Sequence, residues 1–212
     1  MVEISKDTAE KLLRAAEQLE QFRTAVNQAY TVAPKSMDFD FSSALDQLAD
    51  HQYKLSQTWR MVMEGDEGGG TTEAARTVEE AQRVASLTWR ALAEARQEEA
   101  ERIESKLLKT HGDYSELVRV KGDCEALFRK AAELHEKDEP SALEQLRTAA
   151  DRYADYSRNA KAKITGTQTI TARERRRQLL VYISIILAAL AFIGRDNIVN
   201  AFKWIWSLLS KS

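Results

Sequence analysis

Apolar residues recur at alternating spacings of three and four along most of the first 165 residues. This spacing places them on one face of an α-helix, and breaks in the pattern separate five such stretches. They predict helices over 5–32, 42–64, 72–110, 113–137 and 140–164. No stretch shows the strict alternation that a half-buried strand requires. The fold class that we predict is all-α, with an elongated antiparallel helical bundle or coiled-coil head over 1–165.

The breaks between these helices carry residues that favour caps and turns. The four residues Asp7 to Glu10 have the spacing of a capping box, which predicts a helix start there. Residues 33–41 read as a loop, and we expect its Phe39 and Phe41 to pack against the bundle. The run Gly68-Gly69-Gly70 predicts a hinge before the third helix.

The third predicted helix has the weakest apolar stripe, made mainly of small residues. The stripe consists of Val78, Ala81, Ala85, Thr88, Leu92 and Ala95. Because small side chains bury little apolar area, we expect 72–110 to be the most exposed and least rigid helix, with a face that another chain could complete. Trp59 and Trp89 are expected to anchor the core.

The pattern changes after residue 165, where a linker and basic collar are predicted over 166–177. The arginines of this basic collar are Arg173, Arg175, Arg176 and Arg177. Residues 178–194 follow as an apolar segment without charge, for which we predict a transmembrane helix. About sixteen apolar residues give roughly 24 Å of helix, close to the lower limit for crossing a bilayer. The alternative is a buried core helix, but a small bundle could hardly bury such a segment beside four arginines.

Small residues on one face of this segment permit close packing against another helix. They are Ser184, Ala188 and Ala191. Residues 198–210 predict a short amphipathic helix in the membrane interface, with Lys203 on its polar side and Trp204 and Trp206 at the borders of its apolar face. The alternative is a re-entrant hairpin whose polar side faces a neighbouring chain or an aqueous lumen.

Charge is distributed unevenly along the chain. The whole chain has 31 Lys and Arg against 33 Asp and Glu, whereas the part from Arg158 onward has ten against two. The head is therefore acidic and the tail basic, so anionic lipid headgroups are the expected partner of the collar and no nucleic acid is expected. More basic residues precede the apolar segment than follow it, which predicts a single-pass protein with a cytoplasmic head. The absence of an apolar stretch after Met1 agrees with that location.

No residue pattern indicates chemistry. The single cysteine, Cys124, is expected to be a small buried residue, and His51, His111 and His135 are isolated from one another. Neither a phosphate-binding glycine loop nor a nucleophile or metal motif is present, so we expect no enzyme, no metal and no cofactor.

Two functions are compatible with these sequence features. The first is a membrane-anchored scaffold or adaptor, whose bundle contacts a protein partner or a second copy through its helical faces. The second is an oligomerising, membrane-perturbing or pore-forming effector, whose C-terminal segments disrupt the bilayer. The paired tryptophans and the lysine of 198–210 motivate the second function.

Overall fold

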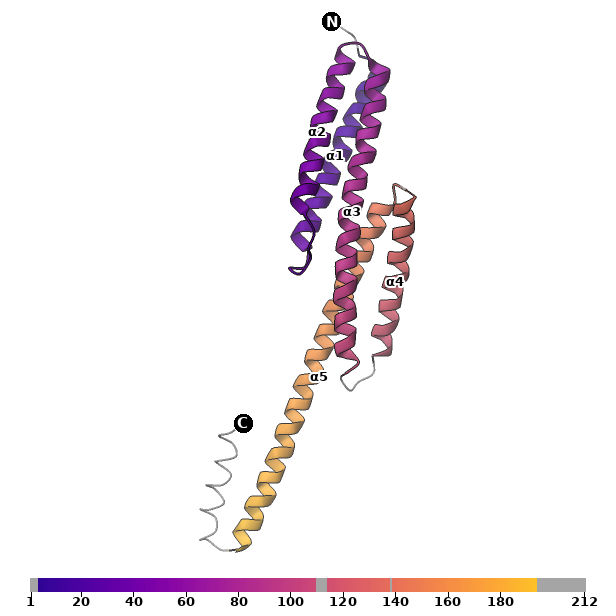
Figure 1. Cartoon of the computed structure of the whole chain (residues 1–212). Coiled ribbons are helices and arrows are strands. Elements are labelled where there is room, and N and C mark those ends of the chain that lie inside the picture. Colours follow the sequence, from indigo (N-terminus) through magenta and orange to yellow (C-terminus); the bar gives the residue numbers. More distant parts are fainter. Residues whose placement is uncertain (1–3, 110–113, 138, 194–212) are drawn as a thin grey trace. The chain divides into compact units, whose positions relative to one another are not determined.

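The computed structural model describes residues 4–109, 114–137 and 139–193, with all their side chains except those of 168–171 and 185–193. Every regular element in these ranges is a helix, which confirms the all-α fold class (Figure 1). The helices are α1 (Lys6–Val32), α2 (Phe41–Met63), α3 (Glu67–Leu107), α4 (Ser115–Glu136) and α5 (Ala142–Ile193). The chain divides into two compact units. Unit 1 comprises Met1–Lys109 and Asp113–Lys161, and unit 2 contains the part from Ala162 onward.

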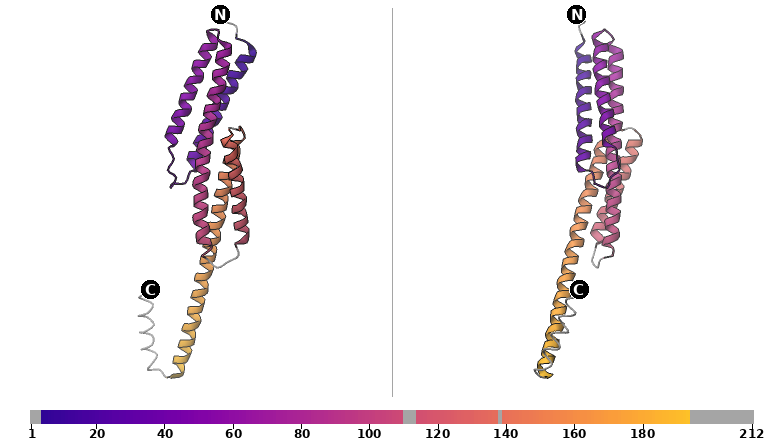
Figure 2. Two further views of the ribbon diagram at one scale, coloured as in Figure 1. Left: turned by 45° about the vertical axis from the view of Figure 1, so that its right-hand side comes forward. Right: turned by 60° about the vertical axis from the view of Figure 1, so that its left-hand side comes forward.

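Unit 1 is a helical bundle with one hydrophobic cluster among α1, α2 and the first half of α3. The two views of Figure 2 show these three helices side by side. The stripe predicted for the first helix is buried here, and α2 and α3 supply the opposite faces. The buried members are Leu12, Ala15, Leu19, Val26, Ala44, Leu48, Leu55, Val62, Ala74, Ala81 and Ala85.

A second cluster joins the later part of α3 to α4, to the beginning of α5, and to Ala29 of α1 and Phe41 of α2. Trp89 and Ala93 of α3 pack there with Ala131 of α4 and with Leu146 and Ala150 of α5. Further along, Tyr153 and Tyr156 of α5 are fully buried, as is Leu107 near the end of α3. Thus α3 takes part in both clusters, with different neighbours along its length.

The expectation that the third helix is the most exposed is wrong. It is buried along its whole length because it carries two apolar stripes, each with spacings of three and four. The first stripe is Ala74, Thr77, Ala81, Ala85, Thr88 and Leu92. The second is Trp89, Ala93, Arg96, Ala100, Ile103 and Leu107. Small side chains let α3 approach its neighbours closely, so low area per residue does not mean low burial.

The predicted hinge at Gly68–Gly70 is the first turn of α3. The Asp66 carboxylate caps this turn by accepting a hydrogen bond from the Gly69 N–H at 2.9 Å,. The chain reverses direction at Gly65, whose φ of 106° lies in the left-handed region that glycine adopts without strain,. Gly70 permits a close approach to α2, since a Cβ there would lie 2.3 Å from a methyl group of Val62. These glycines therefore make a tight corner between two packed helices.

The first helix begins two residues earlier than the capping-box spacing predicts. Ser5 is the N-cap, and its hydroxyl accepts a hydrogen bond from the Thr8 N–H at 3.2 Å. The Glu67 carboxylate of α3 fixes this end by accepting hydrogen bonds from the Ser5 N–H and the Thr8 hydroxyl. These hydrogen bonds lower the pKa of Glu67.

The aromatic expectations for the bundle are confirmed. Phe41 is buried, and Phe39 packs edge-on against it with ring centroids 4.9 Å apart. Trp89 is 2 % exposed, and Trp59 is partly buried against the first cluster. Cys124 is buried and unpaired, as its sequence context predicts.

The linker predicted over 166–177 is helical. α5 continues through Gly166 without a break, and the Thr167 hydroxyl donates a hydrogen bond to the Lys163 carbonyl within it. A single glycine costs a helix only about 1 kcal/mol, and the 52-residue helix α5 continues through it,. The fifth helix therefore does not end near residue 164 but extends into the apolar segment.

Candidate membrane-interaction site

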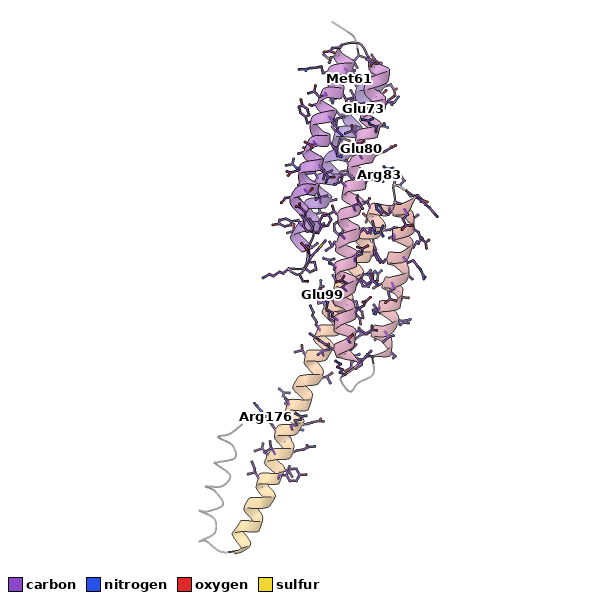
Figure 3. All side chains as sticks on the ribbon, in the orientation of Figure 1. Met61, Glu73, Glu80, Arg83, Glu99 and Arg176 are labelled. Atoms are coloured by element: carbon purple, nitrogen blue, oxygen red, sulfur yellow. The ribbon has the colours of Figure 1, made fainter. Side chains whose placement is uncertain are left out.

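The predicted basic collar lies on α5 within unit 2. All four arginine side chains are exposed, and Figure 3 shows Arg176 projecting from the helix. Four large apolar residues follow within one turn of the collar, each more than half exposed. They are Leu179 at 53 %, Leu180 at 63 %, Val181 at 57 % and Tyr182 at 66 %. Four consecutive residues point to all sides of a helix, so the apolar surface surrounds α5 at this level.

Ser184 is the polar member of the predicted helix-packing face. Its side chain is exposed, and its hydroxyl donates a hydrogen bond to the Leu180 carbonyl at 2.8 Å. A serine bonded to the carbonyl four residues earlier needs no water as a partner, as apolar surroundings require. The side chains of Ala188 and Ala191, and the residues Lys203, Trp204 and Trp206, lie outside what the structure describes.

Within the described residues, no helix contains an apolar run long enough to cross a bilayer. The amphipathic helix predicted over 198–210 also lies outside the described part of the chain. The structure therefore describes the start of the predicted transmembrane segment, where the basic collar directly precedes an exposed apolar surface.

Arg96 of α3 is a buried cation in unit 1 that we did not predict from the sequence. Its side chain is only 8 % exposed. The guanidinium donates hydrogen bonds to the Val32 carbonyl at 3.0 Å and to the Ala150 carbonyl at 2.8 Å. It also lies 3.2 Å from the Asp151 carboxylate. Because the last carbonyls of a helix lack intrahelical partners, Arg96 satisfies the end of α1 while it joins α3 to α5.

A recess of about 610 Å³ lies over Trp89, between α1 and the beginning of α5. Three glutamates line it, together with apolar side chains and one cation, Arg147. The glutamates are Glu17, Glu20 and Glu144. The N–H of the Trp89 indole donates a hydrogen bond to the Ala25 carbonyl at 3.1 Å, which fixes the orientation of the ring. Arg147 lies over the ring, 5.8 Å from its centroid,. We name this surface the acidic recess.

Several ionisable groups of unit 1 have shifted pKa values. His51 lies 3.6 Å from the Glu80 carboxylate, but burial and the nearby Lys54 lower its pKa. Glu80, labelled in Figure 3, accepts a hydrogen bond from Lys54, which lowers the pKa of this glutamate. The Lys121 ammonium is bonded to the Glu104 carboxylate at 2.5 Å.

Two tyrosine hydroxyls on α5 and a thiol on α4 are also buried. Tyr153 and Tyr156 have hydroxyls without a hydrogen-bond partner among the described residues. Burial raises the pKa of both phenols and of the nearby Cys124 thiol. A thiol with a raised pKa is a poor nucleophile, so this arrangement favours a structural role for Cys124.

No group of three or more His, Cys, Asp or Glu side chains within the described ranges has the arrangement of a metal site. Comparisons of the chain with protein-family models, with curated proteins and with solved structures found no match.

Proposed function

We propose that this chain is a non-enzymatic helical protein that attaches to a lipid bilayer through the C-terminal part of α5 and acts through protein contacts of unit 1. One observation carries the proposal, namely the exposed apolar surface of Leu179–Tyr182 directly after four exposed arginines. A basic patch beside an apolar surface matches the order of headgroups and acyl chains in an anionic bilayer. In this arrangement unit 1 is cytoplasmic and the apolar segment crosses the membrane once.

The expected strength of attachment follows from both parts of the site. Moving Leu179, Leu180 and Val181 out of water contributes about 1–2 kcal/mol each, since about half of each side chain is exposed,. Each arginine near an anionic surface adds about 1 kcal/mol. Replacing three of the four should therefore weaken binding to anionic vesicles more than a hundredfold. The same change should have little effect on binding to uncharged vesicles.

The acidic recess supports the second half of the proposal. Its three glutamates and the apolar surface over Trp89 suit a basic amphipathic helix of another protein, whose apolar face would cover Leu143 and Phe22,. We propose this recess as the partner site of unit 1. Reversing the charge of Glu17 and Glu20 should abolish partner binding and leave vesicle binding unchanged.

Vesicle flotation of the full chain tests the attachment. We expect flotation with anionic vesicles, and its loss both in the triple variant Arg175→Gln, Arg176→Gln, Arg177→Gln and at high salt. The matched control replaces three exposed basic residues of unit 1, Lys11, Arg14 and Arg23, by glutamine. Equal loss in the control would show that general charge, and not the collar, is responsible. Absence of flotation with anionic vesicles would contradict the proposed membrane attachment.

Dye release from the same vesicles separates attachment from membrane disruption. An adaptor binds tightly without leakage at any protein density. Leakage that rises with density and is lost when Trp204 and Trp206 are replaced by alanine would establish the pore-forming alternative. Orientation is tested by a cysteine at Ser212, which an impermeant reagent should label from outside the cell if the chain crosses once.

A further inference from the structure

A second recess in unit 1 has the opposite charge to the acidic recess. It measures about 600 Å³ and lies where the end of α1 and the turn after it meet α3 and α5. Five cations and a single carboxylate, that of Glu99, line it, and Figure 3 shows Glu99 on α3. The cations are Lys35, Arg96, Arg102, Arg158 and Lys161. We name this surface the basic recess.

Four of these five cations have a carboxylate nearby, since Asp151 lies 3.2 Å from Arg96 and the other three each have a partner of their own. Arg102 pairs with Glu98 at 3.1 Å and Arg158 with Asp155 at 3.3 Å. Both are exposed pairs within a single helix, which contribute little and exchange readily for a stronger anion. Lys35 has no ion-pair partner within the described residues. The least compensated cation therefore stands at the mouth of the recess.

Two of the cations are already engaged more firmly. Lys161 lies 2.6 Å from the Glu99 carboxylate, so this pair is close to neutral. The Arg96 guanidinium is committed to the Val32 and Ala150 carbonyls and forms the floor of the recess. An incoming anion would consequently meet Lys35, Arg102 and Arg158 as its direct counter-charges.

A turn holds Lys35 in place over the recess. The Met37 N–H donates a hydrogen bond to the Pro34 carbonyl at 3.0 Å, which closes a four-residue turn with Lys35 and Ser36 at its centre,. The N-terminal residue of this turn also lines the recess. The position of the lysine is thus set by backbone geometry and by the end of α1, which Arg96 fixes.

Ser157 of α5 is the second, independent indication of a ligand. The residue lines the recess and is 4 % exposed, and its hydroxyl has no hydrogen-bond partner in the described part of the chain. Buried hydroxyls are normally hydrogen-bonded, because an unmade bond leaves the desolvation of the group uncompensated. Because Ser157 lines the same recess as the cations, its hydroxyl is a candidate donor to an anion oxygen there.

We propose that the basic recess binds a phosphate group, with the Ser157 hydroxyl donating to one oxygen and Lys35, Arg102 and Arg158 supplying the charge. Guanidinium groups bind tetrahedral oxyanions through paired N–H donors, and an ammonium group adds a point charge, a combination suited to a phosphate dianion. The volume also accommodates a substituent on the phosphate. The phosphate belongs either to a soluble phosphate compound or to a lipid headgroup.

Titration of the full chain with inorganic phosphate tests this site. The protein is held in micelles of an uncharged detergent at low ionic strength, and binding is followed by calorimetry and by hydrogen exchange at residues 34–37. We expect saturable binding that protects this turn. Lys35→Gln and Ser157→Ala should each weaken binding about fivefold to tenfold. The control Lys130→Gln changes an exposed lysine of α4 and should have no effect.

Several results would overturn the assignment. They are the absence of saturable binding, binding that Lys130→Gln weakens as much as Lys35→Gln, and binding that does not protect residues 34–37. Helical circular dichroism and the thermal midpoint show that each variant is folded. Since Ser157→Ala removes only a hydroxyl without a partner, it should fold as the parent does.

Vesicles distinguish the two sources of the phosphate. In phosphatidylcholine vesicles with added phosphatidic acid, a headgroup ligand should protect residues 34–37 without added inorganic phosphate, and Lys35→Gln should remove this protection. If only inorganic phosphate protects the turn, the ligand is soluble. The collar variant Arg175→Gln, Arg176→Gln, Arg177→Gln should lose vesicle binding and keep phosphate binding in micelles. Failure of the membrane attachment and failure of this site are therefore separate outcomes.

Discussion

Replacing Arg96 by methionine should destabilise unit 1 far more than replacing its carboxylate partner, Asp151, by asparagine. Methionine keeps most of the apolar stem but removes both hydrogen bonds to the Val32 and Ala150 carbonyls,. Hydrogen bonds from a charged donor contribute about 1.5–3 kcal/mol each, and the Val32 carbonyl at the end of α1 loses its partner. We expect Arg96→Met to lower the free energy of unfolding by about 2–4 kcal/mol.

The Asp151 carboxylate is 61 % exposed, so its pair with Arg96 is screened by water. Asp151→Asn should therefore cost less than about 0.5 kcal/mol. Urea unfolding of the full chain in uncharged detergent, followed by helical circular dichroism, measures both. Arg76→Met, which removes an exposed arginine of α3, is the matched control and should cost no more than about 0.5 kcal/mol,. A loss of unfolding free energy for Arg96→Met within the range of this control would show that the two hydrogen bonds of Arg96 do not stabilise unit 1.

Three further predictions concern packing and protonation. Gly70→Ala should cost about 1–3 kcal/mol by urea unfolding, because its methyl group meets Val62, whereas Gly68→Ala has open space and should be neutral or stabilising,. Burial raises the pKa of Tyr153 above that of an unfolded tyrosine, so stability should fall as the pH rises above about 10, and Tyr153→Phe should reduce this fall without loss at pH 7,. Burial lowers the pKa of His51 below that of an unfolded histidine. The free energy of unfolding should therefore be fully present above about pH 6.5 and should decline as the pH falls through the lower pKa of the folded state. In urea unfolding between pH 8 and 5, His51→Gln should flatten that decline.

Helices that carry a single regular apolar stripe could be located from the sequence. The stripe of α1 from Leu12 to Ala29 and the packing of Phe39 and Phe41 follow directly from spacing and hydrophobicity. The third helix could not be interpreted in this way because two stripes overlap on it. Polar residues such as Thr77 interrupt the first stripe and Arg96 the second, so the periodic signal is weak where burial is greatest.

The buried role of Arg96 did have a sequence signal. The second stripe runs from Trp89 to Leu107 in steps of four and three, and Arg96 occupies one of its core positions. An arginine at a core position of a helix can extend its guanidinium to solvent or bind groups on neighbouring helices. Arg96 does the second because α1 and α5 supply carbonyls that accept its hydrogen bonds. Neither carbonyl can be located from residue types. The prediction of a linker over 166–177 failed for a similar reason. Gly166 lies within α5, and no local sequence signal shows whether a helix continues through a single glycine,.

The sharing of α3 between two clusters has a consequence for synthesis on the ribosome. α1, α2 and the first half of α3 are contiguous in sequence, so the first cluster can form as soon as they emerge,. The second stripe of α3 is completed only by α5, and roughly 50 residues separate Ala93 from Leu146. At about 5–20 residues per second, the faces of Trp89 and Ala93 that α5 later covers stay exposed for roughly 3–10 s in every nascent chain,. The nascent chain is therefore most prone to misassembly with other copies during this interval, before the bundle is complete.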